Sequence, residues 1–440
     1  MGLCKYYPPM DARMGAILAL AGVRQTAILE FGPMGTANYG DMMLSSYGCD
    51  ENPLHFATHM TDTQIAIGDF SALEQAIDSI REHHAPRAIF VVPSALAEIT
   101  GSDIEFVCEE LSTEECLVIA LPPLGIGKDE SFGVAAAFGC LSVLAGANTT
   151  EALAGAQEAG MQGAAAASVA GAHDSVMTAA SQKTQSPEPA TRTYSIIGCV
   201  PNDYSARSDV AEIVGAMRMF FEAEPLCVMP WGSAPELLAQ MGNATINLVI
   251  RGEGLPFAHT MEQRFGVPSV AGRPCGPKQT EAWLHEVAAA TGWELNEDQL
   301  RSEQEKCAVT QRRLATYLAR NYRGCSLDLL LFACYDTAKS VGAYLANELG
   351  IQVTSLCETS SHGGIPLRDE AFWEKFIQEH PGCLVLGDAS MKLCAGNNAA
   401  VISHPAGGRL DMAGRSPLFG FGGARHVVEL VWNLLHEGRR

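Results

Sequence analysis

The feature that most constrains the fold of this 440-residue chain is a repeated alternation of short apolar runs and helical patterns. Each run has the length and the β-branched content of a buried strand. The runs lie at residues 88–92, 116–120, 194–198, 246–250, 327–333, 352–356 and 383–386. Strands that are buried on both faces and alternate with helices form parallel sheets with right-handed crossovers. The pattern therefore predicts an α/β fold with three Rossmann-like, doubly wound parallel-sheet domains around a central cleft.

A segment of low complexity divides the chain. Ala, Gly, Ser, Thr and Gln dominate it, and it ends in Gln185-Ser-Pro-Glu-Pro189, which is typical of a connector. We expect an N-terminal α/β domain at residues 1–145, a linker at 146–193, a second α/β domain at 194–325 and a third at 326–440. Ligands of doubly wound sheets bind beyond the carboxyl ends of the strands, so we expect the site in the cleft between the domains.

The composition disfavours several classes of partner. The formal net charge is −21, and binding to nucleic acid or to an anionic membrane needs clustered Lys and Arg. The longest apolar runs are too short or too rich in Gly and Ala to span a bilayer, and the N-terminal residues do not form a secretory signal. We therefore expect a cytoplasmic protein whose 14 cysteines are thiols or metal ligands.

The turns that follow the predicted strands lack the common nucleotide motifs. Gly-x-Gly-x-x-Gly after a strand, Gly-x-x-x-x-Gly-Lys-Ser/Thr and Gly-x-Ser-x-Gly are all missing from the sequence. These motifs place phosphate groups or a nucleophilic serine at a strand–helix turn. The sequence thus disfavours a nicotinamide-dependent enzyme, a nucleotide-hydrolysing enzyme and an α/β-hydrolase.

Five stretches, taken in order, carry a family resemblance over nearly the whole chain. They are Met14-Gly-Ala-Ile-Leu-Ala-Leu-Ala-Gly-Val23 with Phe31-Gly-Pro-Met-Gly-Thr36, Thr58-His-Met-Thr-Asp-Thr-Gln-Ile-Ala-Ile-Gly68, Pro93-Ser-Ala-Leu-Ala-Glu-Ile-Thr-Gly-Ser-Asp103, Phe265-Gly-Val-Pro268 with Pro274-Cys-Gly-Pro-Lys-Gln-Thr280, and Arg415-Ser-Pro-Leu-Phe-Gly-Phe-Gly-Gly-Ala424. Together they resemble the nitrogenase component 1 family. That family includes nitrogenase, its cofactor-maturation scaffold, and the dark-operative protochlorophyllide and chlorophyllide reductases.

The resemblance implies an iron–sulfur cluster, [4Fe-4S] or P-cluster-like, held by cysteine thiolates at a subunit interface. The matching positions here are Asp11 or a neighbour, Thr36 and Ala95, and none of them is cysteine. Oxygen ligation through Asp11 or Thr36 would be harder than thiolate ligation. Asp11 is either a ligand or the N-cap of a helix over residues 12–21. Cys4 is either a metal ligand on an N-terminal arm or a terminal thiol without a role.

A second departure concerns the active-site metallocluster of nitrogenase. The family's cysteine and histidine ligands match positions near Arg251 and Leu410, which favours a β-type subunit or a cavity for an organic substrate. Arg251, together with Glu253, either meets an anionic substrate or cofactor or forms an internal ion pair. His362 either contacts a substrate or cofactor or lies solvated in a glycine-rich loop.

The resemblance also implies partners. We expect a subunit of a nitrogenase-like reductase that pairs with a homologous α-type subunit in an α2β2 complex. The partner would supply most cluster ligands, and an ATP-hydrolysing iron protein would deliver electrons over the face formed by Asp11, Thr36 and Ala95. Two alternatives stay open: a scaffold or assembly protein that binds a metallocluster or tetrapyrrole, and a cluster-free pseudo-subunit that stabilises its partner.

Overall fold

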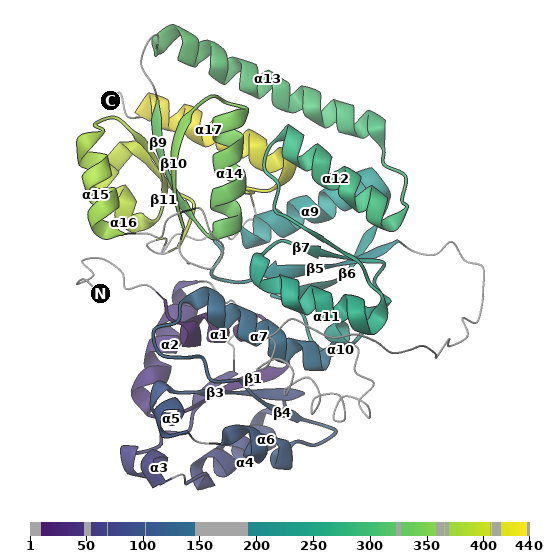
Figure 1. Ribbon diagram of the computed structural model, residues 1–440, viewed down its shortest axis with the longest axis vertical. Helices are drawn as coiled ribbons and strands as arrows, with labels where there is room; N and C mark the ends of the chain where they lie inside the picture. The colour runs from purple at the N-terminus through teal and green to yellow at the C-terminus, as the bar shows by residue number, and fades with distance from the viewer. Residues whose placement is uncertain are drawn as a thin grey trace, which may run out of the picture.

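Three parallel sheets organise the chain, as the sequence predicts (Figure 1). The computed structural model describes residues 10–47, 54–67, 69–101, 103–145, 192–322, 327–357, 365, 369–404, 406 and 415–437. The strand orders are β2-β1-β3-β4, β6-β5-β7-β8 and β10-β9-β11-β12, so each sheet repeats one doubly wound topology. In every sheet the order reverses beside the first strand. Ligands of such sheets bind at this point, beyond the carboxyl ends of the strands.

The first sheet lies in the lower half of Figure 1, with helices on both faces. Its central strands are buried over their full length, because both faces are covered. The elements are α1 (Ala12–Ala21), β1 (Thr26–Phe31), α2 (Met34–Ser46), β2 (Leu54–Ala57), α3 (Asp62–Ile67), α4 (Ser71–His84), β3 (Ala88–Pro93), α5 (Ala95–Thr100), α6 (Ile104–Leu111), β4 (Leu117–Ala120) and α7 (Glu130–Leu144). The predicted linker at 146–193 lies almost entirely outside the described residues.

Helices α1 and α7 approach each other through two glycines. A Cβ on Gly15 would lie 2.2 Å from the carbonyl oxygen of Glu130, and a Cβ on Gly133 would lie 1.7 Å from that of Ala12. Asp11 and Asp129 cap the two helices, and the backbone N–H of Ala12 donates to the Lys128 carbonyl at 3.1 Å. The glycines therefore fix a contact closer than any side chain would allow.

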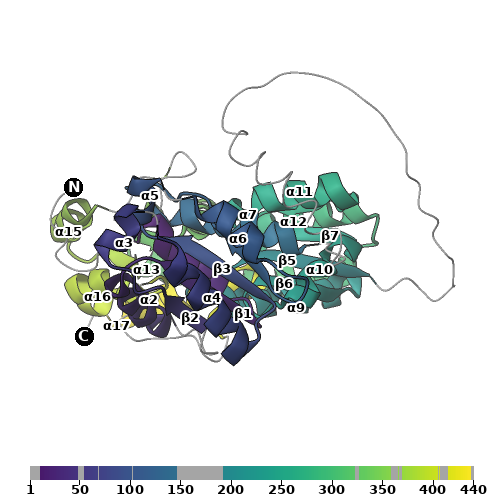
Figure 2. The ribbon, with the colours of Figure 1, turned by 90° about the horizontal axis from the view of Figure 1, so that it is seen from below.

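The second sheet follows the same pattern. Its elements are β5 (Thr193–Cys199), α9 (Ala206–Phe221), β6 (Glu224–Pro230), α10 (Pro235–Ala239), η1 (Met241–Asn243), β7 (Ile246–Val249), η2 (Gly252–Gly254), α11 (Leu255–Phe265), β8 (Ser269–Ala271), α12 (Pro277–Thr291) and α13 (Glu297–Asn321). In Figure 2, which views the molecule from below, the second sheet lies beside the first sheet. The apolar pattern of the sequence did not predict the 25-residue helix α13. Its buried positions are sparse, since only one narrow face packs against the protein.

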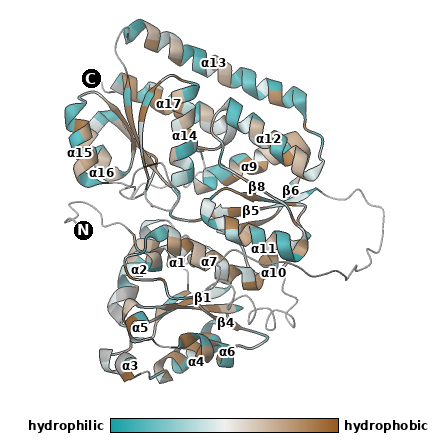
Figure 3. Cartoon of the chain, in the orientation of Figure 1, coloured by the Kyte–Doolittle hydropathy of each residue, from teal (hydrophilic) through white to brown (hydrophobic). Residues whose placement is uncertain are grey.

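The third sheet completes the fold. Its elements are β9 (Asp328–Ala333), α14 (Tyr335–Asn347), β10 (Gln352–Cys357), α15 (Glu370–Glu379), β11 (Leu384–Gly387), α16 (Ala389–Ala395), η3 (Gly396–Asn398), β12 (Ala399–Val401) and α17 (Gly420–Glu437). Helix α17 packs against α9, α12 and α13 of the second domain, and one hydrophobic core joins the two domains. Figure 3 shows the apolar residues concentrated in the strands and in α1 and α7. None of the described helices is long and apolar enough to cross a bilayer.

Candidate functional site

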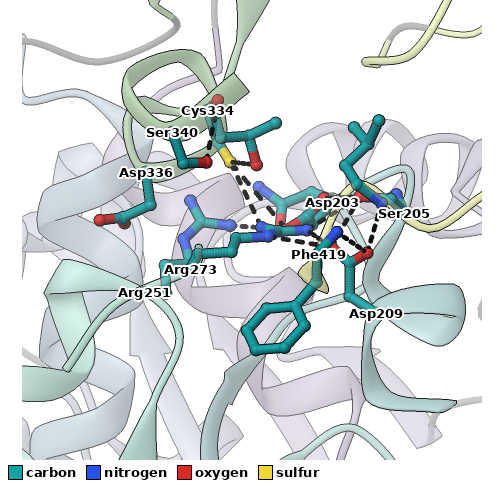
Figure 4. A network of polar contacts seen from close by, with 12 residues as sticks. Asp203, Ser205, Asp209, Arg251, Arg273, Cys334, Asp336, Ser340 and Phe419 are labelled. Carbon is teal, nitrogen blue, oxygen red and sulfur yellow. Dashed lines mark hydrogen bonds and ion pairs between the residues drawn. The ribbon is translucent and has the colours of Figure 1, made fainter. Parts of the chain in front are cut away.

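Polar side chains of the second and third domains meet in the interior, beyond the carboxyl ends of the strands (Figure 4), and Glu130 of the first domain contacts this group through Arg251. Arg251 follows β7 and is buried. Its Nη2 lies 3.0 Å from Oε1 of Glu130, the first residue of α7 in the first domain. Its Nε donates to Oε2 of Glu253 at 3.2 Å, and its Nη1 donates to Oδ1 of Asn202 at 3.2 Å. This arginine therefore joins the first domain to the second.

A second buried arginine lies in the same interior. Arg273 follows β8, and its Nε donates to Oδ2 of Asp209 at 2.9 Å while its Nη2 donates to the Ser205 hydroxyl at 2.8 Å. It also forms an ion pair with Asp203 and contacts the thiol of Cys334, which follows β9. The second arginine thus connects the loop after β5 with the third domain.

Two backbone contacts complete this set of residues. The N–H of Gly252 donates to Oδ2 of Asp336, in the first turn of α14, at 2.9 Å. The N–H groups of Leu418 and Phe419 donate to Oδ1 of Asp209 at 2.6 and 3.0 Å. We call the whole set the central network: Glu130, Asn202, Asp203, Ser205, Asp209, Arg251, Glu253, Arg273, Cys334 and Asp336.

Charges in the central network are matched inside the protein. Burial works against the ionised forms of Asp203 and Glu253, but the neighbouring Arg273 and Arg251 outweigh it and lower the pKa of both carboxyls. Burial raises the pKa of Asp336, which receives only one backbone N–H among the described residues. Burial also raises the pKa of Glu130, against the pull of Arg251. The guanidinium groups of Arg251 and Arg273 therefore lie next to the readily ionised carboxylates of Glu253 and Asp203. The carboxyl groups of Asp336 and Glu130 in the same network bind protons more readily.

A small cavity adjoins the central network. Asn202, Asp203, Cys334, Thr337 and His404 line it, and about 10 Å³ is open to the centre of a water-sized sphere. Burial lowers the pKa of His404 to about 4, so its imidazole is neutral at pH 7. The ring lies edge-on to Tyr47 of the first domain, with centroids 4.4 Å apart. Among the described residues, the expected central cleft has room here for little more than one water molecule.

The structure tests some of the predictions made for Arg251 and Glu253 and leaves those for His362 and Cys4 untested. Of the two interpretations of Arg251 and Glu253, the structure shows the internal ion pair. A role for Arg251 in binding a cofactor stays a prediction. His362 and Cys4 lie outside the described residues.

The face expected to meet a cluster lies in the first domain. Asp11 is the N-cap of α1, since its Oδ1 accepts from the N–H of Met14 at 2.8 Å, and this confirms the helix-cap interpretation. Thr36 lies in the first turn of α2, and Ala95 is the first residue of α5. Both helices start at the carboxyl ends of the adjacent strands β1 and β3, and a Cβ on Gly32 would lie 2.6 Å from that of Ser94. Thr36 and Ala95 therefore belong to one edge of the sheet.

A cluster of charged groups fixes α1, β1, β2 and α2 behind this face. Arg13 Nη1 lies 2.5 Å from Oε2 of the buried Glu30, and His55 bridges Oε1 of Glu30 at 2.9 Å and Oδ1 of Asp41 at 2.6 Å. Burial disfavours the charged form of His55, but the two carboxylates outweigh it and raise its pKa. Neither this cluster nor Arg273 was predicted from the sequence. A charged residue inside an apolar strand, as Glu30 is in β1, was the available signal.

Most cysteines in the described part of the chain are buried thiols, whereas Cys334 is half-buried and Cys394 is exposed. Burial raises the pKa of Cys108, Cys140, Cys199 and Cys227 to about 12, so these side chains are protonated at neutral pH. Within the described ranges, no three His, Cys, Asp or Glu side chains converge as metal ligands would. An all-thiolate iron–sulfur cluster held by this chain alone does not fit the described residues.

Comparison with known proteins agrees with the fold. A solved structure titled "Nitrogenase Cp1 at pH 6.5" superposes with a TM-score of 0.74 at 17% identity, covering 99% of this chain and 95% of that one. The cofactor biosynthesis protein NifE of Methanosarcina barkeri is 31% identical over 133 residues, which are 30% of this chain and 29% of that protein. NifN of Rhodobacter capsulatus is 31% identical over 94 residues, 21% of this chain and 20% of that protein.

A further relative covers more of the chain. A light-independent protochlorophyllide reductase polypeptide of Prosthecochloris aestuarii is 22% identical over 222 residues, half of this chain and 34% of that protein. The chain therefore matches about a third or less of the length of these curated relatives. The family model for nitrogenase component 1 type oxidoreductases, in contrast, matches residues 12–436. By that match, this chain belongs to the nitrogenase component 1 type oxidoreductase family.

Proposed function

We propose that this chain is a ligand-poor, β-type subunit of a cytoplasmic nitrogenase-like reductase complex. A homologous α-type subunit pairs with it in an α2β2 assembly and supplies most ligands of an interfacial iron–sulfur cluster. An ATP-hydrolysing iron protein with its own [4Fe-4S] cluster delivers the electrons. The face of Asp11, Thr36 and Ala95 is turned toward the shared cluster.

One observation carries the proposal: a component 1 fold over nearly the whole chain is combined with a cluster face that lacks thiolates among its described residues. The family model matches residues 12–436. At the face, the carboxylate of Asp11 caps a helix, and Ala95 has no ligand atom. A cluster placed there needs soft anionic ligands from a second chain.

The central network supports the same assignment. Two buried arginines and their carboxylates occupy the junction of the three domains, where a doubly wound fold would otherwise bind a ligand. Arginine is always protonated and is not a metal ligand. A metallocluster held within this subunit is therefore disfavoured, and the cluster at the subunit face becomes the stronger candidate.

A second candidate is an assembly protein that binds a metallocluster without turnover. Two relatives favour it, since NifE and NifN are both named as iron-molybdenum cofactor biosynthesis proteins. The reductase relative, at 22% identity, covers half of this chain, whereas NifE covers 30%. The two candidates differ in whether substrate is reduced by the assembled complex.

Anaerobic purification tests the proposal. The chain is purified alone and together with a cysteine-bearing homologous subunit, and iron and acid-labile sulfide are measured in each product. We expect both elements only in the joint complex, whose cluster should be reduced by an iron protein with ATP. Iron and sulfide in the chain alone, lost in Cys4→Ser, would contradict the ligand-poor assignment. A complex free of iron would contradict the redox function altogether.

The role of Asp11 needs a matched pair of variants. Asp11→Asn keeps a good N-cap but removes the carboxylate, whereas Asp11→Ala removes both. If Asp11 is a ligand in the complex, iron content falls equally in the two variants. If it is only a helix cap, Asp11→Asn retains the iron and Asp11→Ala loses about 1 kcal/mol of stability.

A further inference from the structure

Cys334 differs from the other cysteines that the structure describes. It is half-buried, whereas Cys394 is exposed and the others are buried. It follows β9 and is the N-cap of the 13-residue helix α14, within the central network. In Figure 4 its sulfur points toward the guanidinium group of Arg273. This thiol therefore combines partial exposure with a cationic neighbour.

Polar groups on three sides contact the sulfur of Cys334. Nη1 of Arg273 donates to Sγ at 3.6 Å. As a thiol, Cys334 donates to Oγ1 of Thr337 at 3.2 Å, and as a thiolate it would accept from that hydroxyl instead. Oδ2 of Asp203 lies 4.0 Å away, but its charge is matched by the ion pair with Arg273. A cation and the N-terminus of a helix both favour the thiolate over the thiol.

The charges of the two buried arginines are consistent with an anionic sulfur. Burial disfavours the charged forms of Arg251 and Arg273, but nearby acidic groups outweigh it and raise the pKa of both guanidinium groups. Carboxylates make the largest of these contributions, and Cys334 contributes at both arginines. Because a Coulombic interaction acts equally on its two partners, both guanidinium groups also stabilise a thiolate at Cys334.

The small cavity beside this sulfur offers polar groups to a ligand. Ser403 and His404 line the same cavity as Cys334, and they are only 4% and 5% exposed. The Ser403 hydroxyl has no hydrogen-bond partner among the described residues. The ring of His404 lies edge-on to two tyrosines and forms no hydrogen bond with the part of the chain that the structure describes. Since buried polar groups are normally hydrogen-bonded, this pair is suited to an oxygen atom in the cavity.

We propose that Cys334 is a peroxide-reactive thiol, and that the cavity beside it admits hydrogen peroxide and holds the oxygen of the sulfenic acid that forms. About 10 Å³ is open to the centre of a water-sized sphere. Hydrogen peroxide is only slightly larger than water, whereas common thiol reagents are many times larger. The inference does not depend on the proposed function, because it concerns residues of this chain alone.

The reaction needs peroxide as its only co-reactant. The thiolate sulfur attacks one oxygen of hydrogen peroxide, an S–O bond forms as the O–O bond breaks, and hydroxide leaves. Sulfur gives an electron pair and is oxidised, while the peroxide is reduced. The hydroxide takes up one proton, which balances the proton that the thiol released on ionisation, so the products are a sulfenic acid and water. Arg273 stabilises the thiolate before attack, and the Ser403 hydroxyl donates to the bound oxygen.

Peroxide treatment of the full chain tests the proposal. The reduced protein is exposed to hydrogen peroxide and then denatured in the presence of dimedone, and mass spectrometry of its peptides locates each sulfenic acid. We expect Cys334 to react at least about tenfold faster than the exposed Cys394, because its thiolate is stabilised. A bulky aromatic disulfide reagent should reverse this order, because the cavity excludes it. Cys199, whose pKa burial raises to about 12, should react with neither reagent.

Two serines provide a matched pair of variants. Ser403→Ala removes the hydroxyl in the cavity and should slow the oxidation of Cys334 about tenfold, as the loss of one hydrogen bond would. Ser390→Ala also removes a buried hydroxyl without a partner in the described part of the chain, but one that does not line the cavity. It should leave the rate unchanged. Thermal unfolding shows whether each variant is folded.

Several results would overturn the proposal. One is a rate of peroxide oxidation at Cys334 no faster than at Cys394 in the wild-type chain, a comparison that holds even if a variant fails to fold. Another is rapid labelling of Cys334 in the native protein by the bulky reagent. Equal effects of Ser403→Ala and Ser390→Ala would show that the cavity takes no part in the reaction.

Discussion

Arg251 and Glu130 form a buried ion pair, Nη2 to Oε1 3.0 Å, whose partners lie 121 positions apart in the chain and in different domains. The same arginine binds Glu253 and Asn202, and the neighbouring Gly252 N–H donates to Asp336 of the third domain. The junction of the three domains is therefore held by a few charge-assisted hydrogen bonds. It also occupies the position where a doubly wound fold binds its ligand.

Removal of one partner from this pair should destabilise the junction strongly. Arg251→Gln leaves the buried Glu130 and Glu253 without a counter-charge, a change that typically costs about 3–5 kcal/mol. Urea denaturation followed by tryptophan fluorescence should show the loss. Arg218→Gln is the control, since Arg218 pairs with Glu224 on the surface, where solvent screens the interaction and its loss should have little effect. Equal effects of the two variants would contradict a special role for the junction.

Two glycines on one helix should respond in opposite directions to the same change. Gly133→Ala on α7 forces a methyl group into the Ala12 carbonyl and should cost about 1–3 kcal/mol or more. Gly139→Ala, on the exposed side of α7 with nothing within 4 Å, should stabilise the helix by about 0.5–1 kcal/mol. Thermal unfolding of both variants checks the pair. A neutral Gly133→Ala would show that α1 and α7 are not in close contact.

His404 should make the protein sensitive to acid. Its pKa is about 4 in the folded protein and near its ordinary value of 6.5 when unfolded, so the unfolded state binds the extra proton. Stability is retained above pH 6.5 and falls as the pH drops toward 4, by about 3 kcal/mol from this group. His404→Gln should reduce that slope in urea titrations at pH 7 and 4.5. An unchanged slope would place the acid sensitivity elsewhere.

His55 should show the opposite dependence. Its pKa is raised by Glu30 and Asp41 against the effect of burial, so the folded state holds the proton more firmly. The contribution is complete below pH 6.5 and is lost as the pH rises through the folded pKa. His55→Gln should therefore cost more stability at pH 6 than at pH 9. A variant that loses equal stability at both values would show that the imidazole is not charged.

Much of the fold could be predicted from the chain. The runs at residues 88–92, 194–198 and 246–250 correspond to β3, β5 and β7, because strands buried on both faces are continuously apolar. Four strands were missed, namely β1, β2, β6 and β8. Of these, β2 and β8 are short and half-exposed and therefore resemble loops. Helix α13 was missed because one narrow apolar face gives a weak periodic signal.

The sequence by itself determined the class of fold and the family, because the periodicity of apolar residues and the order of motifs can be seen along the chain. It also showed that the positions of Asp11, Thr36 and Ala95 hold no cysteine. It also left Arg251 and Glu253 with two interpretations. Only the tertiary structure decided between them, since Glu130 and Asn202 are 121 and 49 positions away from Arg251. The tertiary structure also decided the pKa values of the two buried histidines. The pKa of His404 is about 4 and that of His55 is raised, because carboxylates pack around His55 in the fold, and neighbours along the chain do not predict this difference.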